Sequence, residues 1–414
     1  MRILYLTPSL QHPAMRGPAR HYYFIRELAQ RHAITLLTLT RSEVSRPVMR
    51  EMIEYTERTL VFPINGAANS HAGAKPARPP IYGERIKQRR EFREAVKRMK
   101  EAFVRLLRQQ SFDLVLFHGK GIFPVIEDCC DLPVVVDFCD ATSMRIRHRM
   151  QYAGPAKLPL LMWRYWQVRR IEKKLIRKSP HLAFVSCRDR EAILGAGSKA
   201  EVVPLGVDTQ YWKRESPHGQ ANCLVFTGVM NYAPNEDAAI YLIEKIVPLI
   251  RQSIPRLQVF IVGRDPGPVL QDKARRHPEV TVTGFVDDVR PYLERAAVFA
   301  APLRFGSGVQ NKVLEAMAMG VPVVTTSLVA AGLRVDGAAT PPVFVADGEK
   351  QFAGRVVNLL QHEEARARLA EEGRRFVENH FVWSRSAEKL EQMLLAAVGL
   401  KKLRPSDRFS KAVL

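Results

Sequence analysis

Short, continuously apolar segments alternate along the chain with longer segments in which apolar residues recur every three or four positions. In the first half, apolar segments lie at residues 2–7, 34–39, 114–117, 134–138 and 182–186. Continuous apolar strands of this length are typical of parallel sheets covered by helices on both faces. The alternation therefore predicts an α/β fold, with a first helix over residues 19–31.

The same alternation begins again after residue 208. Strands are predicted at residues 224–227, 257–262, 280–283, 298–301 and 321–325, and helices at 237–254 and 312–319. This indicates two Rossmann-like, doubly wound domains that face each other across a cleft. We expect an N-terminal domain over residues 1–205, a second domain over 206–380, and a helix and tail over 381–414 that packs back on the first domain.

The positive charge of the chain is concentrated in the first domain. Of the 414 residues, 46% are hydrophobic and 25% charged, as in ordinary globular proteins. Residues 1–205 contain 36 basic and 19 acidic side chains, a net charge of +17, whereas the remainder carries only +4. No helix-turn-helix or RNA-binding signature accompanies this charge, so we do not expect a nucleic-acid partner.

Two basic segments suggest contact with a membrane surface. Residues 85–108 have an amphipathic helical pattern rich in Lys and Arg, and in residues 159–178 PLLMWRYW is followed by RRIEKKLIRK. Cationic amphipathic helices and interfacial aromatic rings bind anionic leaflets. We therefore expect an anionic membrane as a partner; the alternative is that both segments are solvated faces of helices packed on the sheet.

Cysteine usage and the length of the apolar runs point to the cytoplasm. The five cysteines are odd in number and lack C-x-x-C spacing, which argues against a disulfide framework and a structural zinc site. No apolar run reaches the roughly 20 residues of a spanning helix. We expect a cytoplasmic protein that is peripheral at the inner face of the cell membrane.

The most informative stretch is PLRFGSGVQNKVLEAMAMGVPVV at residues 302–324. Its glycines let the backbone bend closely around a ligand, and the amides at the start of the following helix favour an anion. Lys312 and Glu315 are three positions apart and share a helix face, so they could address a phosphate and a hydroxyl of one nucleotide diphosphate. An isolated Lys-x-x-Glu could instead be a solvated surface pair.

This stretch resembles the retaining glycosyltransferases of family 4 (glycosyl transferases group 1), which have the GT-B fold of two Rossmann-like domains. Residues 314–324 match the family motif LEAMAxGxPVV. The resemblance implies that Glu315 binds the ribose hydroxyls, that Lys312 meets the diphosphate, and that neither a metal ion nor another cofactor is required. More narrowly, TGVMNYAPNEDA, VFIVGRDP and VTGFVDDVRPYL resemble the sugar transferases associated with PEP-CTERM/exosortase and exopolysaccharide loci.

The resemblance also implies donor-binding residues in the loops after several strands. The backbone of residues 284–286 would read the base, and the other loops would approach the phosphates. The full set is Gly17, Gly228, Arg264, Gly284, Phe285, Val286, Gly306, Ser307 and Gly308.

Three positions depart from the broader family. Ser307 stands where the E-x7-E motif has its first Glu. The segment GVMNYAPNED lacks the usual Arg and Lys pair, so Lys312, with Arg264 or Arg304, would have to neutralise the diphosphate. The segment VVVDFCDATS lacks the active-site His of the acceptor domain, and Cys139 and Asp140 occupy its place.

A polar cluster remains at the end of that strand. Asp137 and Asp140 could orient donor or acceptor hydroxyls, which makes them candidate catalytic residues beside Lys312 and Glu315. Arg145 and Arg147 could hold an acceptor pyrophosphate. Asp140 could instead cap the following helix. His118, at the end of another strand, is a reserve candidate.

We expect a retaining glycosyltransferase that moves a sugar from a nucleotide-diphosphate sugar to a glycan or polyprenyl-linked acceptor in bacterial exopolysaccharide or cell-surface glycan biosynthesis. The alternatives are a nucleotide-sugar epimerase of the same fold and a non-catalytic nucleotide-sugar-binding subunit. The missing His counts against the epimerase, whereas Ser307 and Cys139 motivate the non-catalytic subunit.

Overall fold

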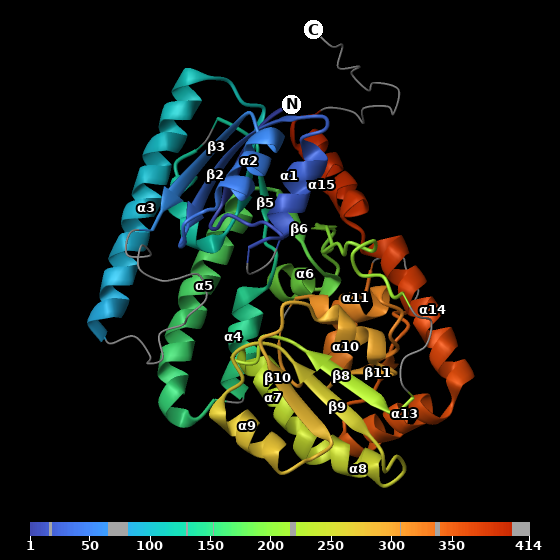
Figure 1. Cartoon of the computed structure of the whole chain (residues 1–414). Helices are drawn as coiled ribbons and strands as arrows, with labels where there is room; N and C mark the ends of the chain where they lie inside the picture. The colour runs from blue at the N-terminus through green and yellow to red at the C-terminus, as the bar shows by residue number, and fades with distance from the viewer. Residues whose placement is uncertain are drawn as a thin grey trace.

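The structure is a computed structural model that describes residues 1–15, 19–64, 82–129, 131–151, 153–215, 221–306, 308–335 and 340–399. It contains two separate parallel sheets, one above the other in Figure 1. The predicted α/β class with two doubly wound sheets is confirmed.

The first sheet has the strand order β3-β2-β1-β4-β5-β6-β7. Its strands are β1 (Arg2–Thr7), β2 (Ala33–Thr40), β3 (Arg58–Pro63), β4 (Leu114–His118), β5 (Val134–Asp137), β6 (His181–Phe184) and β7 (Glu201–Val202). Alternate residues of β1 enter different cores. Leu4 and Leu6 pack with α3 (Tyr82–Gln109), and Ile3 and Tyr5 pack with α1 (Arg20–Leu28). Both faces of the strand are therefore buried, which explains its continuous apolar sequence.

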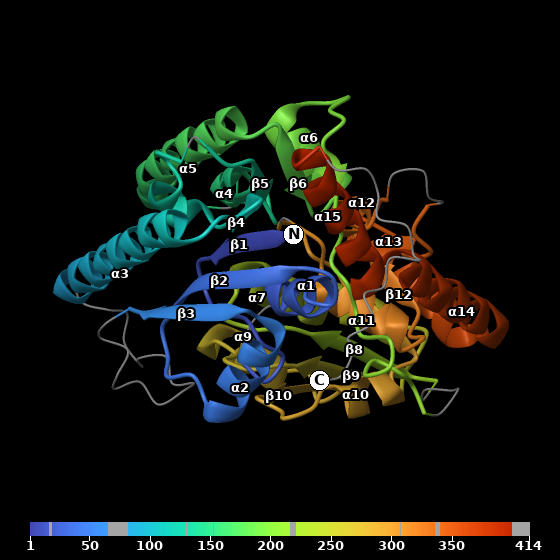
Figure 2. The ribbon, with the colours of Figure 1, turned by 90° about the horizontal axis from the view of Figure 1, so that it is seen from above.

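A helix from the C-terminal part of the chain completes one face of the first domain. This helix, α15 (Trp383–Ala397), lies against α1, where the Trp383 ring stacks on Tyr23 with centroids 4.5 Å apart (Figure 2). Leu390 and Leu394 enter the same core as Ile3. The other helices of this domain are α2 (Arg46–Tyr55), η2 (Lys120–Val125), α4 (Thr142–Gln151), η3 (Pro155–Lys157), α5 (Leu158–Lys178) and α6 (Cys187–Leu194).

The second sheet has the strand order β10-β9-β8-β11-β12-β13. Its strands are β8 (Cys223–Thr227), β9 (Gln258–Val262), β10 (Val280–Gly284), β11 (Val298–Ala301), β12 (Val323–Thr325) and β13 (Phe344–Val345). Its helices are α7 (Ala233–Tyr241), η4 (Leu242–Ile246), α8 (Val247–Arg251), α9 (Pro268–Arg275), α10 (Arg290–Arg295), α11 (Asn311–Ala318), α12 (Ser327–Gly332), α13 (Glu349–Gln361) and α14 (Glu363–His380). One helix was expected over residues 237–254, but three consecutive pieces are found. Pro248 lacks the amide hydrogen that an uninterrupted helix would require.

The chain crosses between the domains twice, and the two crossing segments run side by side. The Val207 amide donates to the Phe381 carbonyl at 2.6 Å, and Val207 forms a β-bridge with Val382. Gly206 packs so closely under Trp383 that a Cβ there would lie 2.4 Å from its ring. The two crossings are therefore joined to each other.

Each sheet has one point where the strand order reverses direction. These points lie between β1 and β4 and between β8 and β11. In doubly wound sheets, ligands bind outside the carboxyl ends of the strands at such points. The loops after these four strands are therefore the first places to search for a site.

Candidate active site

Lys312 and Glu315 lie on α11, which follows β11 at the reversal point of the second sheet. The loop that joins β11 to α11 includes Gly308, whose φ of 71° favours glycine. Lys312 Nζ donates a hydrogen bond to Asn235 Oδ1 and lies 4.9 Å from the centroid of the Phe226 ring. The structure thus directs this cation toward the segment that follows the neighbouring strand, β8.

Burial opposes ionisation of both Lys312 and Glu315. It lowers the pKa of Lys312 to about 7, against the favourable field of Glu315. It also raises the pKa of Glu315 to about 7, against the favourable field of Lys312. An anion placed beside Lys312 would favour its ammonium form. The pair is therefore sensitive to a charged ligand.

Two glycines allow the β8 and β9 loops to approach Lys312. A Cβ at Gly228 would lie 2.6 Å from Asn235 Nδ2 and 3.3 Å from Lys312 Nζ. A Cβ at Gly263, where φ is +146°, would lie 1.8 Å from the Gly228 carbonyl oxygen. A side chain at Gly263 would require movement of the backbone, and one at Gly228 would displace the Asn235 side chain.

Asn235 is a site residue that sequence reasoning missed. It is buried in the first turn of α7, where its Nδ2 donates to the Val229 carbonyl at 3.0 Å and its Oδ1 accepts from Lys312. An Asn near a helix start is usually explained by capping, so its position gave no separate signal. Its proximity to Gly228 becomes evident only in the folded chain.

The other residues predicted to bind the donor make no contact with Lys312 or Glu315 among the interactions described. Gly284 ends β10 with a φ of 72°, Phe285 is 57% exposed, and Val286 packs partly on the core. Arg264 lies in the β9 loop, where its carbonyl accepts from the Met230 amide. The Arg304 side chain bonds Asp237 at 2.9 Å, so Asp237 already holds it. Gly17 and Ser307 lie outside the described residues.

Asp137, at the end of β5, is held in a buried ion pair. Arg20 Nε donates to Asp137 Oδ2 at 2.9 Å, and the Cys139 amide donates to Asp137 Oδ1 at 3.2 Å. Burial raises the pKa of this carboxyl, but the Arg20 guanidinium outweighs that effect and lowers the pKa to about 2. With both oxygens occupied, this environment favours a structural role for Asp137.

Asp140 is more accessible and also ionised. Its carboxylate accepts from the Thr142 hydroxyl at 2.8 Å and pairs with Arg145 at 3.1 Å. Burial acts against the charge, but Lys120 and Arg145 outweigh it, so the pKa is lowered. The contact with Thr142, the first residue of α4, joins two side chains and is not a helix cap, in which a backbone amide would donate. Arg145, an ion-pair partner of Asp140, lies at the domain boundary.

A histidine pair lies beside this strand end. His118 Nδ1 donates to the Asp137 carbonyl at 2.9 Å, and its ring centroid lies 4.2 Å from that of His21. His21 Nδ1 bonds the Tyr5 hydroxyl, and within the described parts of the chain its buried Nε2 has no hydrogen-bond partner. Burial lowers the pKa of both rings. Sequence reasoning missed His21 because the α1 sequence RHYYFIREL mixes polar and apolar residues, and nothing in it distinguishes this His from an ordinary helix residue.

The glycine-rich loop touches the first domain. His148 Nδ1 bonds the Gly306 carbonyl at 3.2 Å, and Arg188 donates to the Gly308 carbonyl at 3.0 Å. These contacts bring α4 and α6 against the loop that leads to Lys312. The carboxyl edges of the two sheets therefore face each other, as the sequence predicted.

A cavity of about 560 Å³ lies at this boundary, which we call the interdomain cavity. Its first-domain wall comes from α4 and α5, and its second-domain wall from the start of α7 and the glycine-rich loop. The lining residues are Thr142, Arg145, Ile146, Arg149, Leu161, Arg164, Gln167, Val168, Asn231, Tyr232, Ala233, Pro234 and Phe305. Arg147 does not belong to this lining.

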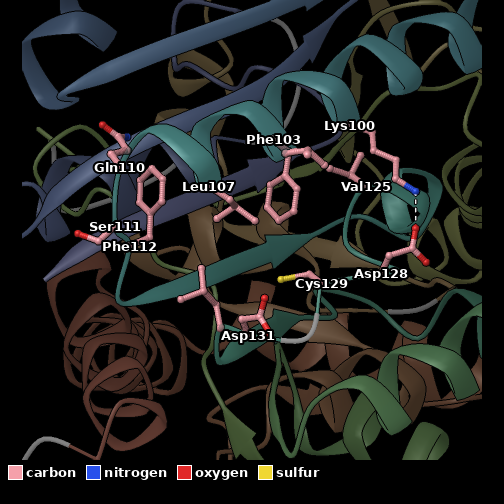
Figure 3. Close-up of a pocket in the computed structure, with 12 residues that line it drawn as sticks. Lys100, Phe103, Leu107, Gln110, Ser111, Phe112, Val125, Asp128, Cys129 and Asp131 are labelled. Atoms are coloured by element: carbon pink, nitrogen blue, oxygen red, sulfur yellow. Dashed lines mark hydrogen bonds and ion pairs between the residues drawn. The ribbon is translucent and has the colours of Figure 1, made fainter.

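A second hollow lies at the opposite edge of the first sheet (Figure 3). Phe103 and Leu107 of α3, with Phe112 before β4, form its apolar wall, and Lys100 pairs with Asp128 at its rim. These segments precede the strands, so the hollow lies at their amino ends. Ligands of doubly wound sheets bind at the carboxyl ends, and we assign this hollow no part in the site.

In the described ranges, no group of three or more His, Cys, Asp or Glu could hold a metal ion. In the same ranges, none of the helices combines the length and apolarity needed to cross a membrane.

Comparisons with known proteins assign the class of the chain. Residues 221–362 match the family model of the glycosyl transferases group 1. No curated protein matches the sequence. This matched region contains Gly228, Asn235, Lys312 and Glu315.

Solved structures agree with this match in fold. The chain resembles Anabaena HepE, crystallised with UDP and glucose, at 14% identity over 96% of this chain and 100% of that one, with a TM-score of 0.64. It resembles the sucrose-phosphate synthase of Thermosynechococcus elongatus at 15% identity over 96% and 99%, with a TM-score of 0.66. It also resembles WaaG, a glycosyltransferase involved in lipopolysaccharide biosynthesis, at 16% identity over 95% and 99%, with a TM-score of 0.61. The predicted GT-B fold and the predicted enzyme class are both confirmed.

Proposed function

Since the chain is a glycosyltransferase with the GT-B fold, we propose that it transfers a sugar, with retention of anomeric configuration, from a nucleotide-diphosphate sugar. The observation that carries this proposal is the convergence of Lys312 and Asn235 on Gly228, at the reversal point of the family-matched domain, with Glu315 one helical turn from Lys312 and within its electrostatic field. The structural similarity of this chain to HepE, whose crystal structure contains UDP and glucose, supports a nucleotide sugar as the donor.

In this proposal, Lys312 and the first amides of α11 stabilise the charge that grows on the leaving diphosphate. A buried ammonium acts strongly there because little water screens it. Binding of the anion would raise the lowered pKa of Lys312 and restore its charge. Glu315, once ionised, accepts hydrogen bonds from the ribose hydroxyls. These groups perform the neutralisation without a metal ion.

We place the acceptor against the first domain, where His118 ends β4 and Asp140 lies in the loop that follows the neighbouring strand β5. Asp140 is ionised and can accept a hydrogen bond from an acceptor hydroxyl. The acceptor is a glycan or a polyprenyl-linked sugar of bacterial exopolysaccharide or cell-surface glycan synthesis, used at the inner membrane face. The charge of +17 in residues 1–205 and the narrower likeness to PEP-CTERM/exosortase-associated transferases support this placement.

The test is incubation with a panel of labelled nucleotide-diphosphate sugars and a membrane lipid extract. Transfer with the donor's anomeric configuration, read by NMR, is the expected result. Lys312→Ala and Glu315→Ala should each reduce transfer at least tenfold, because a charge-assisted contact is worth about 1.5–3 kcal/mol. An epimerised donor would identify an epimerase instead. Binding without turnover would identify a non-catalytic subunit, and inversion would refute the retaining mechanism.

A further inference from the structure

The interdomain cavity has a positive charge that the donor site does not use. Arg145 and Arg149 are four residues apart on α4 and share one helix face, and Arg164 of α5 lines the same cavity. Arg145 pairs with Asp140. Within the described ranges, neither Arg149 nor Arg164 has an ion-pair partner, and no acidic residue is among those that line the cavity. Two arginines without an ion-pair partner, beside a third that pairs with Asp140, favour a phosphate in the cavity that all three line.

This cavity borders the donor site without containing its cation. Pro234 in the wall directly precedes Asn235, which binds Lys312, and Phe305 belongs to the loop that leads to α11. A second anion bound by the arginines would therefore lie beside the nucleotide sugar. In a transfer reaction the molecule beside the donor is the acceptor.

An apolar strip on α5 runs from the edge of this cavity into solvent. The strip consists of Leu160, Met162, Trp163 and Trp166, which are 49–66% exposed. Leu160 lies one helical turn before Arg164, and Trp163 lies one turn before Gln167, so both adjoin residues that line the cavity. Tryptophans beside cations are typical of protein surfaces at the membrane interface.

We propose that the interdomain cavity binds the phosphate group of a lipid-linked acceptor, whose hydrocarbon chain lies along the α5 strip. The proposal rests on the proposed sugar transfer and specifies its acceptor. Charge complementarity identifies the anion, because the lining contains three arginines and no carboxylate. The exposed strip next to it distinguishes a lipid phosphate from a soluble sugar phosphate, because a soluble ligand would leave four large apolar side chains in water.

The first test measures binding to phosphatidylcholine vesicles that carry a polyprenyl diphosphate, with phosphatidylglycerol vesicles of equal charge as reference. The wild-type protein should bind the diphosphate vesicles at least tenfold more tightly, and R149Q/R164Q should abolish this preference. R147Q is the matched control, because Arg147 is an exposed arginine on α4 about 200° around the helix from Arg145. Absence of the preference, or its survival in R149Q/R164Q, would overturn the proposal.

The second test separates a lipid from a soluble phosphate. With excess nucleoside diphosphate filling the donor site, W163A/W166A should bind diphosphate vesicles at least tenfold more weakly but bind inorganic diphosphate like the wild type. If inorganic diphosphate binds as tightly as the lipid form, the lipid assignment is wrong. Calorimetry with the nucleoside diphosphate should give wild-type affinity for every variant. Failure of the wild type to use any nucleotide sugar would defeat the proposed function, whereas the vesicle results would stand separately.

Discussion

Arg20 and Asp137 form a buried pair whose loss should destabilise the first domain. Arg20→Gln leaves a buried carboxylate without its partner, which costs about 3–5 kcal/mol. In the folded chain the pKa of Asp137 is about 2, below its value in an unfolded chain, so the pair stabilises above about pH 4 and this contribution is lost as the pH falls toward 2. The lost contribution is about 2 kcal/mol.

The measurement is denaturant unfolding of the wild type and R20Q between about pH 2 and 7. The wild type should lose stability more steeply on acidification than R20Q does. A variant with wild-type stability but no transfer activity would instead show that Asp137 and Arg20 serve the substrate.

Lys312 and Glu315 should make donor binding depend on pH in both directions. Above about pH 7 Lys312 loses its charge, and below about pH 7 Glu315 is protonated, so the affinity for a nucleoside diphosphate should be greatest near neutrality. Arginine stays charged, so K312R should remove the alkaline decline, and E315Q should remove the acid decline. Calorimetry across this pH range tests both. A wild-type affinity that does not change with pH would contradict the assignment of both Lys312 and Glu315 to donor binding.

At the scale of elements, the turn after β9 should tolerate only glycine. Gly263→Ala places a methyl group 1.8 Å from the Gly228 carbonyl oxygen, so the β8 loop beside Lys312 has to move. We expect at least tenfold weaker donor binding together with a lower melting temperature. Gly354→Ala in α13 is the control, since outside its neighbours in the helix no atom lies within 4 Å of the new methyl group. That change should stabilise by about 0.5–1 kcal/mol. Equal behaviour of the two variants would contradict this account of the loop packing.

Most of the strands that could be predicted from sequence are buried on both faces. The apolar segment at residues 2–7 is β1, and the one at 298–301 is β11, because central parallel strands contact helices on each side. The strands that were missed are β3, β7 and β13, each at the edge of its sheet. β7 and β13 have only two residues each, too few to stand out as apolar runs, and β3 is only half-buried. Tertiary position, not local sequence, defines them.

At the scale of the whole molecule, the donor half of the site was more predictable than the acceptor half. Lys312 and Glu315 lie three residues apart in one motif, so their shared helix face follows from helix geometry. The group at the end of β5 combines His21, His118 and Asp137, which are far apart in sequence. Only the strand order places these residues together, and sequence spacing carries no signal of that.

The charge distribution of the whole molecule leads to our last prediction, electrostatic binding of the first domain to anionic membranes. The apolar side of α3 is used in the core, where Met99 and Phe103 are buried. Its exposed side carries a row of cations, Arg89, Arg90, Arg93 and Lys97. Each cation near an anionic leaflet is worth about 1 kcal/mol within a Debye length. Replacing these four residues with Gln should therefore weaken binding to phosphatidylglycerol vesicles at least tenfold, and salt should weaken wild-type binding steeply.

The matched control removes four exposed arginines from α9, α14 and the residue after α9, namely Arg275, Arg276, Arg368 and Arg375. It has the same net charge as the α3 variant but should bind vesicles like the wild type, because these residues belong to the second domain.

A blue shift of Trp163 and Trp166 fluorescence on mixing with vesicles would show that α5 enters the membrane interface. Equal loss in both variants would mean that net charge alone governs binding. If binding does not respond to salt, the basic face of α3 is only a solvated helix surface and does not bind the membrane.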